Sequence, residues 1–185
     1  MDAAQASGMT HAELGHALRE HAYLEGDFVL RSGRRSRYYL DKYRFETQPE
    51  LLRALGERLA AEVREHEPDA TRIAGPELGA VALAAATSLA SGLPFLIVRK
   101  ETKGYGTDKR LEGVFEPGER VCLVEDVVTS GGAALSAVQA LRDAWLKCAT
   151  AVCVVDREEG GSDSLARHAV RLRRLFTASD VLSTT

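Results

Sequence analysis

The chain has 185 residues, of which 45% are hydrophobic and 28% are charged, and its formal net charge at pH 7 is −3. This composition is typical of one soluble globular domain, and it argues against a disordered chain and against a general nucleic-acid binder. The sequence contains no apolar run of the roughly eighteen residues that span a membrane, and its N-terminus lacks the features of a secretory signal. We therefore expect a cytoplasmic protein.

The first third of the chain predicts two helices with a basic, aromatic segment between them. A helix is predicted over residues 10–22, because Thr10 and Glu13 form a capping-box pattern and apolar residues follow at four-residue spacing. The segment FVLRSGRRSRYYLDKYRF follows and is β-like around its tyrosine pair. A second helix is predicted to start near Pro49 and to continue through Val63.

From Arg72 onward, short apolar runs alternate with helical patterns. The runs RIAG, FLIV, VCLV and TAVCVV predict strands, and LGAVALAAATSLA and ALSAVQALRDAWL predict helices. Uninterrupted apolar strands that alternate with helices are typical of a parallel sheet covered on both faces. The sequence therefore predicts one α/β domain with an N-terminal appendage of about 45 residues, a final strand and a polar tail.

The cysteines and the single tryptophan indicate structure rather than chemistry. Cys122, Cys148 and Cys153 show no metal-ligand spacing, and the first and last lie inside apolar runs. We expect them to be reduced, buried hydrophobic residues. Trp145 is expected to anchor the core or an interface.

Polar residues gather directly after each predicted strand. Gly-Pro-Glu-Leu-Gly follows RIAG, Arg-Lys-Glu-Thr-Lys follows FLIV, Glu-Asp and then Thr-Ser-Gly-Gly follow VCLV, and Asp-Arg-Glu-Glu follows TAVCVV. Ligands of open parallel sheets bind beyond the carboxyl ends of the strands. Four polar clusters at this one edge predict a ligand site.

The stretch VCLVEDVVTSGG, residues 121–132, combines two acids with a turn suited to phosphate. Its Thr-Ser-Gly-Gly turn offers backbone N–H groups and hydroxyls at the start of a helix, and it matches neither the Walker pattern nor the dinucleotide fingerprint. Glu125 and Asp126 would be costly at a buried strand end unless they met hydrogen-bond donors or a cation. A phosphorylated sugar would satisfy both features. A tight turn without ligand, a metal-only site and a solvated strand end are the alternatives.

This stretch resembles the phosphoribosyl pyrophosphate (PRPP) motif of type I phosphoribosyltransferases, and its Glu-Asp-Val-Val-Thr-Ser-Gly form is similar to that of orotate phosphoribosyltransferases. FVLRSGRRSRYYLD, IAGPELGAVALA, LPFLIVRKETKGYGT and VVDREEGG also occur in the family's order, so the resemblance covers about residues 26–160. It implies a central, mostly parallel sheet flanked by helices, with an α/β core at about 46–180. A small hood would comprise about residues 1–45 and C-terminal elements.

The resemblance implies an enzyme of pyrimidine nucleotide biosynthesis. It would transfer the 5-phosphoribosyl group from PRPP to orotate, giving orotidine 5-phosphate and pyrophosphate. Mg²⁺ is implied as the cofactor, held mainly by PRPP and water near Glu125 and Asp126, with no protein ligand assigned. Displacing pyrophosphate requires positioned cations and needs no protein nucleophile.

The resemblance assigns site roles position by position. Glu125 and Asp126 would bind the ribose hydroxyls, and the turn that follows them would wrap the 5-phosphate. The positions that match PRPP-binding residues are Gly75, Glu77, Gly79, Lys100, Glu125, Asp126, Val127, Val128, Thr129, Ser130, Gly131 and Gly132. The positions that match catalytic residues are Lys103, Arg99 and Asp126. The positions that match orotate-binding residues are Arg31, Tyr38, Tyr39, Thr129 and Arg157.

Residues 100–113 form a long polar segment, which suits a lid that closes over PRPP and excludes water. An ordinary surface loop is the alternative. In the resembling family this loop commonly reaches the neighbouring subunit's site, which implies a homodimer. Two positions depart from the family: Tyr105 replaces a histidine, and Gly79 replaces a lysine that some members carry. Backbone N–H groups and Mg²⁺ are expected to do more of the pyrophosphate binding here.

The basic cluster near the N-terminus leaves alternatives open. Six cations (Arg31, Arg34, Arg35, Arg37, Lys42 and Arg44) are interleaved with tyrosines, a pattern that fits single-stranded nucleic acid, a solvated face or a base-binding hood. The alternatives to the proposed enzyme are therefore a PRPP-sensing regulator that binds nucleic acid and a phosphoribosyltransferase for a purine base. Arg157 and a cationic hood favour an acidic pyrimidine, and we do not expect nucleic acid or a membrane as a partner.

Overall fold

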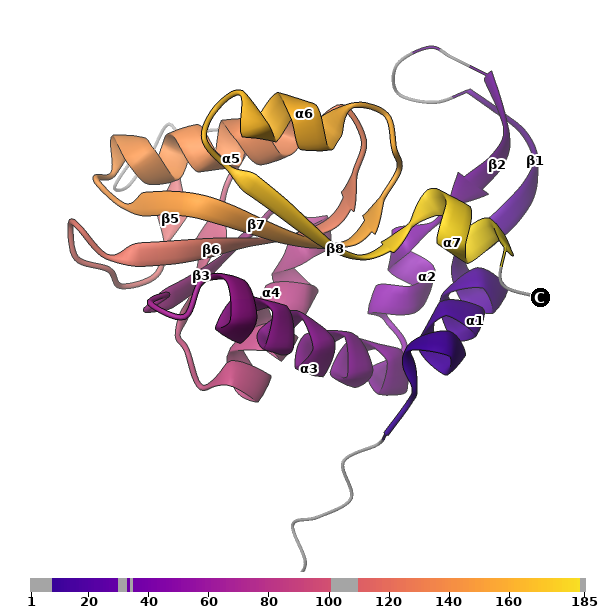
Figure 1. The fold of residues 1–185 in the computed structure, drawn as a ribbon, viewed down its shortest axis with the longest axis horizontal. Helices are drawn as coiled ribbons and strands as arrows, with labels where there is room; N and C mark the ends of the chain where they lie inside the picture. The colour runs from indigo at the N-terminus through magenta and orange to yellow at the C-terminus, as the bar shows by residue number, and fades with distance from the viewer. Residues whose placement is uncertain (1–7, 30–32, 34, 101–109, 184–185) are drawn as a thin grey trace, which may run out of the picture.

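A six-stranded sheet forms the centre of the molecule, with the strand order β5-β4-β3-β6-β7-β8 (Figure 1). The computed structural model describes residues 8–29, 33, 35–100 and 110–183. The strands are β3 (Arg72–Pro76), β4 (Phe95–Val98), β5 (Leu111–Glu112), β6 (Arg120–Val128), β7 (Lys147–Asp156) and β8 (Arg171–Thr177). All neighbouring pairs are parallel except β4 and β5. The predicted α/β class with a mostly parallel sheet is confirmed.

Helices cover both faces of this sheet. Figure 1 shows α3 (Pro49–His66) and α4 (Gly79–Ser91) on one side, and α5 (Gly132–Asp143) and α6 (Gly161–Ala166) on the other. Alternate residues of β6 enter the two cores: Cys122 and Val124 pack on the α3 side, and Val121 and Leu123 pack on the α5 side. Because both faces are buried, the strand reads as one continuous apolar run.

The N-terminal elements pack beside the sheet together with the end of the chain. They are α1 (His11–Ala22), the antiparallel hairpin of β1 (Tyr23–Val29) and β2 (Arg35–Leu40), and α2 (Lys42–Glu46). The C-terminal helix α7 (Ala178–Ser183) lies against α1, where Arg19 donates to the backbone oxygens of Val181, at 3.3 Å, and Leu182. That these elements form a hood over a base stays a prediction.

Several local predictions are confirmed. The Thr10–Glu13 capping box is present at the start of α1, and α3 begins at Pro49. The three cysteines are buried and unbridged. None of the helices in the described part of the chain is long and apolar enough to cross a membrane.

Other local predictions are wrong. Residues 178–183 form α7 where a polar tail was predicted, and the local signal for this helix is a reciprocal pair in which Thr177 and Asp180 cap each other's backbone N–H groups. Trp145 is 79% exposed in the turn after α5, so it does not anchor the core, and its alternative role at an interface stays a prediction. The sequence analysis also missed β1, α2, α6 and the short strand β5, all of which lack a regular hydrophobic period.

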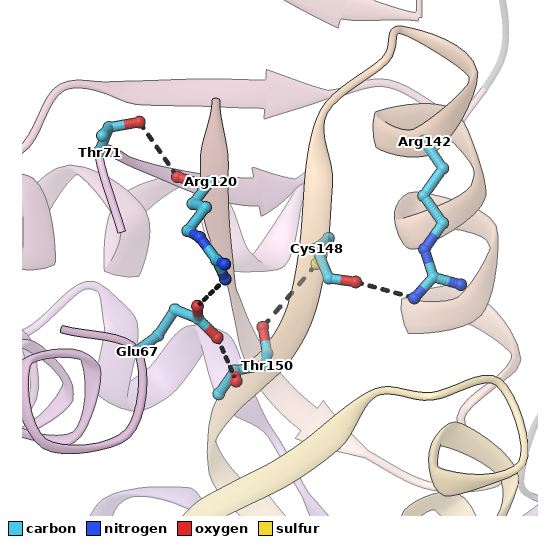
Figure 2. A network of polar contacts seen from close by, with 6 residues as sticks. All are labelled: Glu67, Thr71, Arg120, Arg142, Cys148 and Thr150. Atoms are coloured by element: carbon cyan, nitrogen blue, oxygen red, sulfur yellow. Dashed lines mark hydrogen bonds and ion pairs between the residues drawn. The ribbon is translucent and has the colours of Figure 1, made fainter. Parts of the chain in front are cut away.

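A buried polar network ties the amino ends of the strands to α3 (Figure 2). The carboxylate of Glu67, only 7% exposed, accepts hydrogen bonds from Thr150 Oγ1 at 2.6 Å and from Arg120 Nη1 at 3.2 Å. Nearby, Arg142 of α5 donates to the Cys148 carbonyl oxygen at 2.8 Å. This network lies at the edge of the sheet opposite to the predicted ligand site, so it serves stability.

Thr150→Val is expected to lower the free energy of unfolding by about 1–3 kcal/mol, because it removes a donor from a buried carboxylate and leaves the volume unchanged. The matched control is Thr71→Val, which removes a hydroxyl that donates to the Arg120 carbonyl oxygen at the surface. The control should change the free energy by less than about 0.5 kcal/mol. Urea denaturation of both variants measures the difference, and equal losses would contradict the role given to the network.

Candidate active site

The order of the strands reverses at β3, because β4 lies on one side of it and β6 on the other. Such a reversal opens a crevice between the turns at the carboxyl ends of the two outgoing strands. Helix α4 packs tightly against the end of β3, since a Cβ on Gly75 would lie 2.6 Å from both the Ala80 carbonyl oxygen and the Ala84 Cβ. The residues predicted for PRPP at β3 and β6 therefore flank one crevice.

Glu125 and Asp126 are both buried near the end of β6, at 6% and 4% exposed. Asp126 accepts hydrogen bonds from the Val127 N–H and from the ammonium of Lys42. Glu125 Oε1 has no hydrogen-bond partner among the described residues. Burial, and then the neighbouring Asp126, raise the pKa of Glu125 to about 8. An unsatisfied buried carboxyl group here favours a ligand that brings hydroxyl donors.

The turn after β6 presents an anion site at the start of α5. Thr129 and Ser130 are exposed, and Gly131 takes φ of +82° as the N-cap residue. The turn rests on the one after β7, because a Cβ on Gly161 would lie 2.5 Å from the Thr129 carbonyl oxygen. The two hydroxyls therefore stand beside the free N–H groups of a twelve-residue helix, an arrangement that binds phosphate.

Arg157 links the end of β7 to the N-terminal hairpin. Its backbone N–H donates to the Val128 carbonyl oxygen at 2.9 Å, and its guanidinium carbon lies 5.3 Å from the centre of the Tyr38 ring. The guanidinium forms an ion pair with Glu159 at 3.2 Å, while its buried Nε has no partner among the described residues. Tyr39 is on the opposite face of β2, with its ring 5.6 Å from that of Phe28. The structure thus brings Tyr38, but not Tyr39, to Arg157.

The cations after β4 stand at the start of the predicted lid. Arg99 is held by its backbone N–H bond to Arg110 at 2.8 Å, and its guanidinium lies 3.9 Å from Glu112. The backbone N–H of Lys100 donates to Glu77 Oε1 at 2.8 Å, so this carboxylate braces the lid rather than pointing free into the crevice. The predicted site residues Lys103 and Arg31, and the departure Tyr105, lie outside the described residues.

Two residues of α2 extend the acidic site in a way that the sequence analysis missed. Lys42 pairs with Asp126, and Glu46 is 4% exposed with its Oε1 unpartnered within the described residues. Burial, followed by the charge of Asp126, raises the pKa of Glu46 to about 8. The sequence of α2 shows no hydrophobic periodicity, and Lys42 is one of six similar cations in the basic cluster. Only the folded structure therefore distinguishes Lys42 from the other five.

The described residues contain no group of three or more His, Cys, Asp or Glu side chains that could hold a metal ion. Glu125 and Asp126 still suit a divalent cation whose other ligands come from a bound phosphorylated sugar and from water, because carboxylate oxygens are preferred ligands of Mg²⁺.

A family model, sequence relatives and solved structures all point to the same protein family. Residues 44–173 match the phosphoribosyl transferase domain. The orotate phosphoribosyltransferase of Methanocella arvoryzae is 52% identical over 158 residues, which are 85% of this chain and 88% of that protein. The crystal structure of the Aeropyrum pernix enzyme of the same name has a TM-score of 0.81 and 35% identity, covering 91% of this chain and 96% of that one. The Mycobacterium tuberculosis enzyme in complex with PRPP has a TM-score of 0.77 and 31% identity, covering 92% and 98%.

Glu46→Gln is expected to change how stability depends on pH. The pKa of Glu46 is raised to about 8 in the folded protein, so the group contributes stability that is present below its ordinary value of 4.5. That contribution is lost as the pH rises through 8. The groups that surround it are Asp41, Lys42, Glu125 and Asp126. Raising the pH from 5.5 to 8.5 should therefore lower the free energy of unfolding of the unchanged protein, relative to that of Glu46→Gln, by about 1.4 kcal/mol or more. This amount corresponds to one pKa unit.

Urea denaturation at the two pH values measures this shift. The control is Glu20→Gln, which alters an exposed glutamate of α1 and should show no comparable shift. A pH-independent difference between Glu46→Gln and the unchanged protein would rule out a buried, proton-binding Glu46.

Proposed function

The chain belongs to the orotate phosphoribosyltransferases within the phosphoribosyl transferase domain family, and from this membership we propose how its site acts. The protein is a transferase that moves the 5-phosphoribosyl group of PRPP to orotate, giving orotidine 5-phosphate and pyrophosphate in pyrimidine nucleotide biosynthesis. The observation that carries this function is the buried acid pair of β6, followed directly by the phosphate turn and flanked by Arg157.

PRPP lies along the carboxyl edge of the sheet in this proposal. The 5-phosphate accepts hydrogen bonds from Thr129, Ser130 and the N-terminal N–H groups of α5, in the turn formed by residues 127–132. Glu125 and Asp126 accept hydrogen bonds from the ribose hydroxyls, which supply the donor that the buried Glu125 Oε1 lacks among the described residues. The pyrophosphate lies against the turn of residues 75–80 and the cations that follow β4.

The base occupies the space between the sheet and the N-terminal hairpin. Arg157 directs its planar guanidinium, which has an unpartnered Nε, towards the orotate carboxylate. Tyr38 provides an aromatic face beside it. Arg31 and Thr129 complete the predicted set, whereas Tyr39 faces away from Arg157 and contributes to hairpin packing instead.

The reaction requires stabilisation of charge on the departing pyrophosphate. The bond between C1 and pyrophosphate breaks with its electron pair leaving on oxygen, while the bond from orotate nitrogen to C1 forms and the nitrogen gives up its proton. Arg99, Lys100 and Lys103 hold the leaving group, and no protein nucleophile takes part. Bound Mg²⁺, held mainly by PRPP and water near Glu125 and Asp126, supplies further positive charge to the pyrophosphate.

The protein also forms a homodimer in the cytoplasm in this proposal. The lid of residues 100–113 covers PRPP and reaches the neighbouring site of a homodimer, as the family resemblance implies. The three unbridged, buried cysteines support a reducing, cytoplasmic environment.

The base specificity is tested by mixing the protein with Mg²⁺ and PRPP and following the absorbance of orotate, with adenine, hypoxanthine and uracil assayed in parallel. Turnover is expected with orotate and not with the other three bases. Turnover of a purine without orotate would overturn the base assignment. Salt-dependent nucleic-acid binding without any turnover would instead indicate a regulator.

Arg157→Leu is expected to raise the KM for orotate roughly 10- to 100-fold, the scale of a hydrogen bond to a charged group. The KM for PRPP should change little, and Arg157→Lys should recover part of the loss because it keeps the charge without the guanidinium fork. Arg167→Leu, at an exposed position after α6, is the control and should leave both constants unchanged. Equal increases in both KM values for Arg157→Leu would remove the residue from the base site.

A further inference from the structure

Lys42 carries a positive charge from α2 into the carboxyl edge of the sheet. Its ammonium forms an ion pair with Asp126, which is 84 residues away in the sequence. The Lys42 side chain is 30% exposed, whereas that of Asp126 is 5% exposed. An ammonium has three donors, and Asp126 is its one hydrogen-bond acceptor within the described residues. Lys42 therefore covers the buried carboxylate and still presents donors towards solvent.

Gly79 makes this position available. A Cβ on Gly79 would collide with the Asp126 carboxylate and with the Lys42 ammonium, and it would lie 2.9 Å from Lys42 Cε. The end of the Lys42 side chain therefore occupies the space directly over the first residue of α4. A side chain at position 79 would require the Asp126 carboxylate, the Lys42 ammonium or both to move, so the glycine leaves room for this ion pair as it stands.

The turn beneath Lys42 has no positive side chain of its own. Residues 75–80 read Gly-Pro-Glu-Leu-Gly-Ala, and their contribution to an anion would be the N–H groups at the start of the thirteen-residue helix α4. Burial lowers the pKa of Lys42, but the charge and hydrogen bond of Asp126 outweigh burial and leave the pKa raised. The side chain is thus a full cation placed over a helix N-terminus.

We propose that Lys42 is a further substrate-binding residue, which contacts the pyrophosphate group of PRPP over the start of α4 while it stays paired with Asp126. This inference rests on the proposed function, because it takes PRPP as the ligand of the crevice. Asp126 fixes the ammonium next to the ribose hydroxyls, and the ribose carries the pyrophosphate. The Lys42 ammonium has three donors, so it can bind the Asp126 carboxylate and the pyrophosphate at the same time. It thereby adds a positive charge to the turn of residues 75–80, which otherwise offers only backbone N–H groups.

The test measures the reverse reaction, in which the protein converts orotidine 5-phosphate and pyrophosphate to orotate and PRPP. Lys42→Met keeps much of the apolar stem and removes the charge. It should raise the KM for pyrophosphate roughly 10- to 100-fold, the scale of a charged hydrogen bond, while the KM for orotidine 5-phosphate changes much less. Lys147→Met, at the exposed amino end of β7, is the matched control and should change neither constant.

Gly79→Ala provides a second, independent variant. Its added Cβ should displace Lys42, so it should also raise the KM for pyrophosphate. Because both substitutions disturb one contact, Lys42→Met combined with Gly79→Ala should cost far less than the product of the two single effects. Thermal unfolding of each variant shows whether the protein remains folded, and the direct binding of pyrophosphate by calorimetry gives a readout that needs no turnover.

The possible outcomes separate this inference from the proposed function. If the unchanged protein turns over orotate and Lys42→Met has an unaltered KM for pyrophosphate, the role of Lys42 is overturned and the function stands. Equal increases for pyrophosphate and orotidine 5-phosphate would also overturn it, because Lys42 would then act only by holding Asp126. If the unchanged protein has no activity with orotate, the proposed function fails first.

Discussion

Burying two adjacent carboxyl groups at the end of β6 is the constraint on which the ligand-binding edge depends. Taking a carboxylate out of water is costly unless a cation or hydrogen-bond donors replace the water. The protein compensates Asp126 with Lys42 and with the Val127 N–H, whereas Glu125 Oε1 has no partner among the described residues and burial raises the pKa of Glu125. In the proposed function, the ribose hydroxyls of PRPP would supply the partner that Glu125 Oε1 lacks among the described residues.

Glu67 shows what a structural acid looks like in the same fold. It is as buried as the acids of the site, but Thr150 and Arg120 satisfy it within the protein. It lies at the amino edge of the sheet, and the acids with unpartnered oxygens lie at the carboxyl edge. Burial alone therefore does not distinguish a functional carboxylate here. The distinguishing property is whether the folded chain provides its partners.

The sequence was sufficient to predict features that depend on local pattern. Apolar runs located the core strands because both faces of the sheet are covered. The acid pair was predicted at the carboxyl end of a buried strand, and the structure places it there. It could not predict the pairing of Lys42 with Asp126, because no local signal joins residues 84 positions apart. A strand here would have predicted that Tyr38 and Tyr39 face opposite sides, because neighbouring residues of a strand do so. The segment shows no clear alternation of apolar and polar residues, however, so the strand itself was not firmly predicted.

Among the described residues, two contacts join the N-terminal elements to the sheet at the candidate site, and each involves a group that the proposed function gives to a different substrate. Arg157 meets Tyr38 on the side given to the base, and Lys42 meets Asp126 on the side given to ribose and pyrophosphate. PRPP and orotate, when both are bound, would together contact the N-terminal elements and the sheet, which are distant in sequence. The free energy of binding PRPP and orotate together would then also stabilise the position of the N-terminal elements on the sheet, because ligands that bind only the assembled form favour it. In the proposed function, the hairpin and α2 would therefore belong to the site.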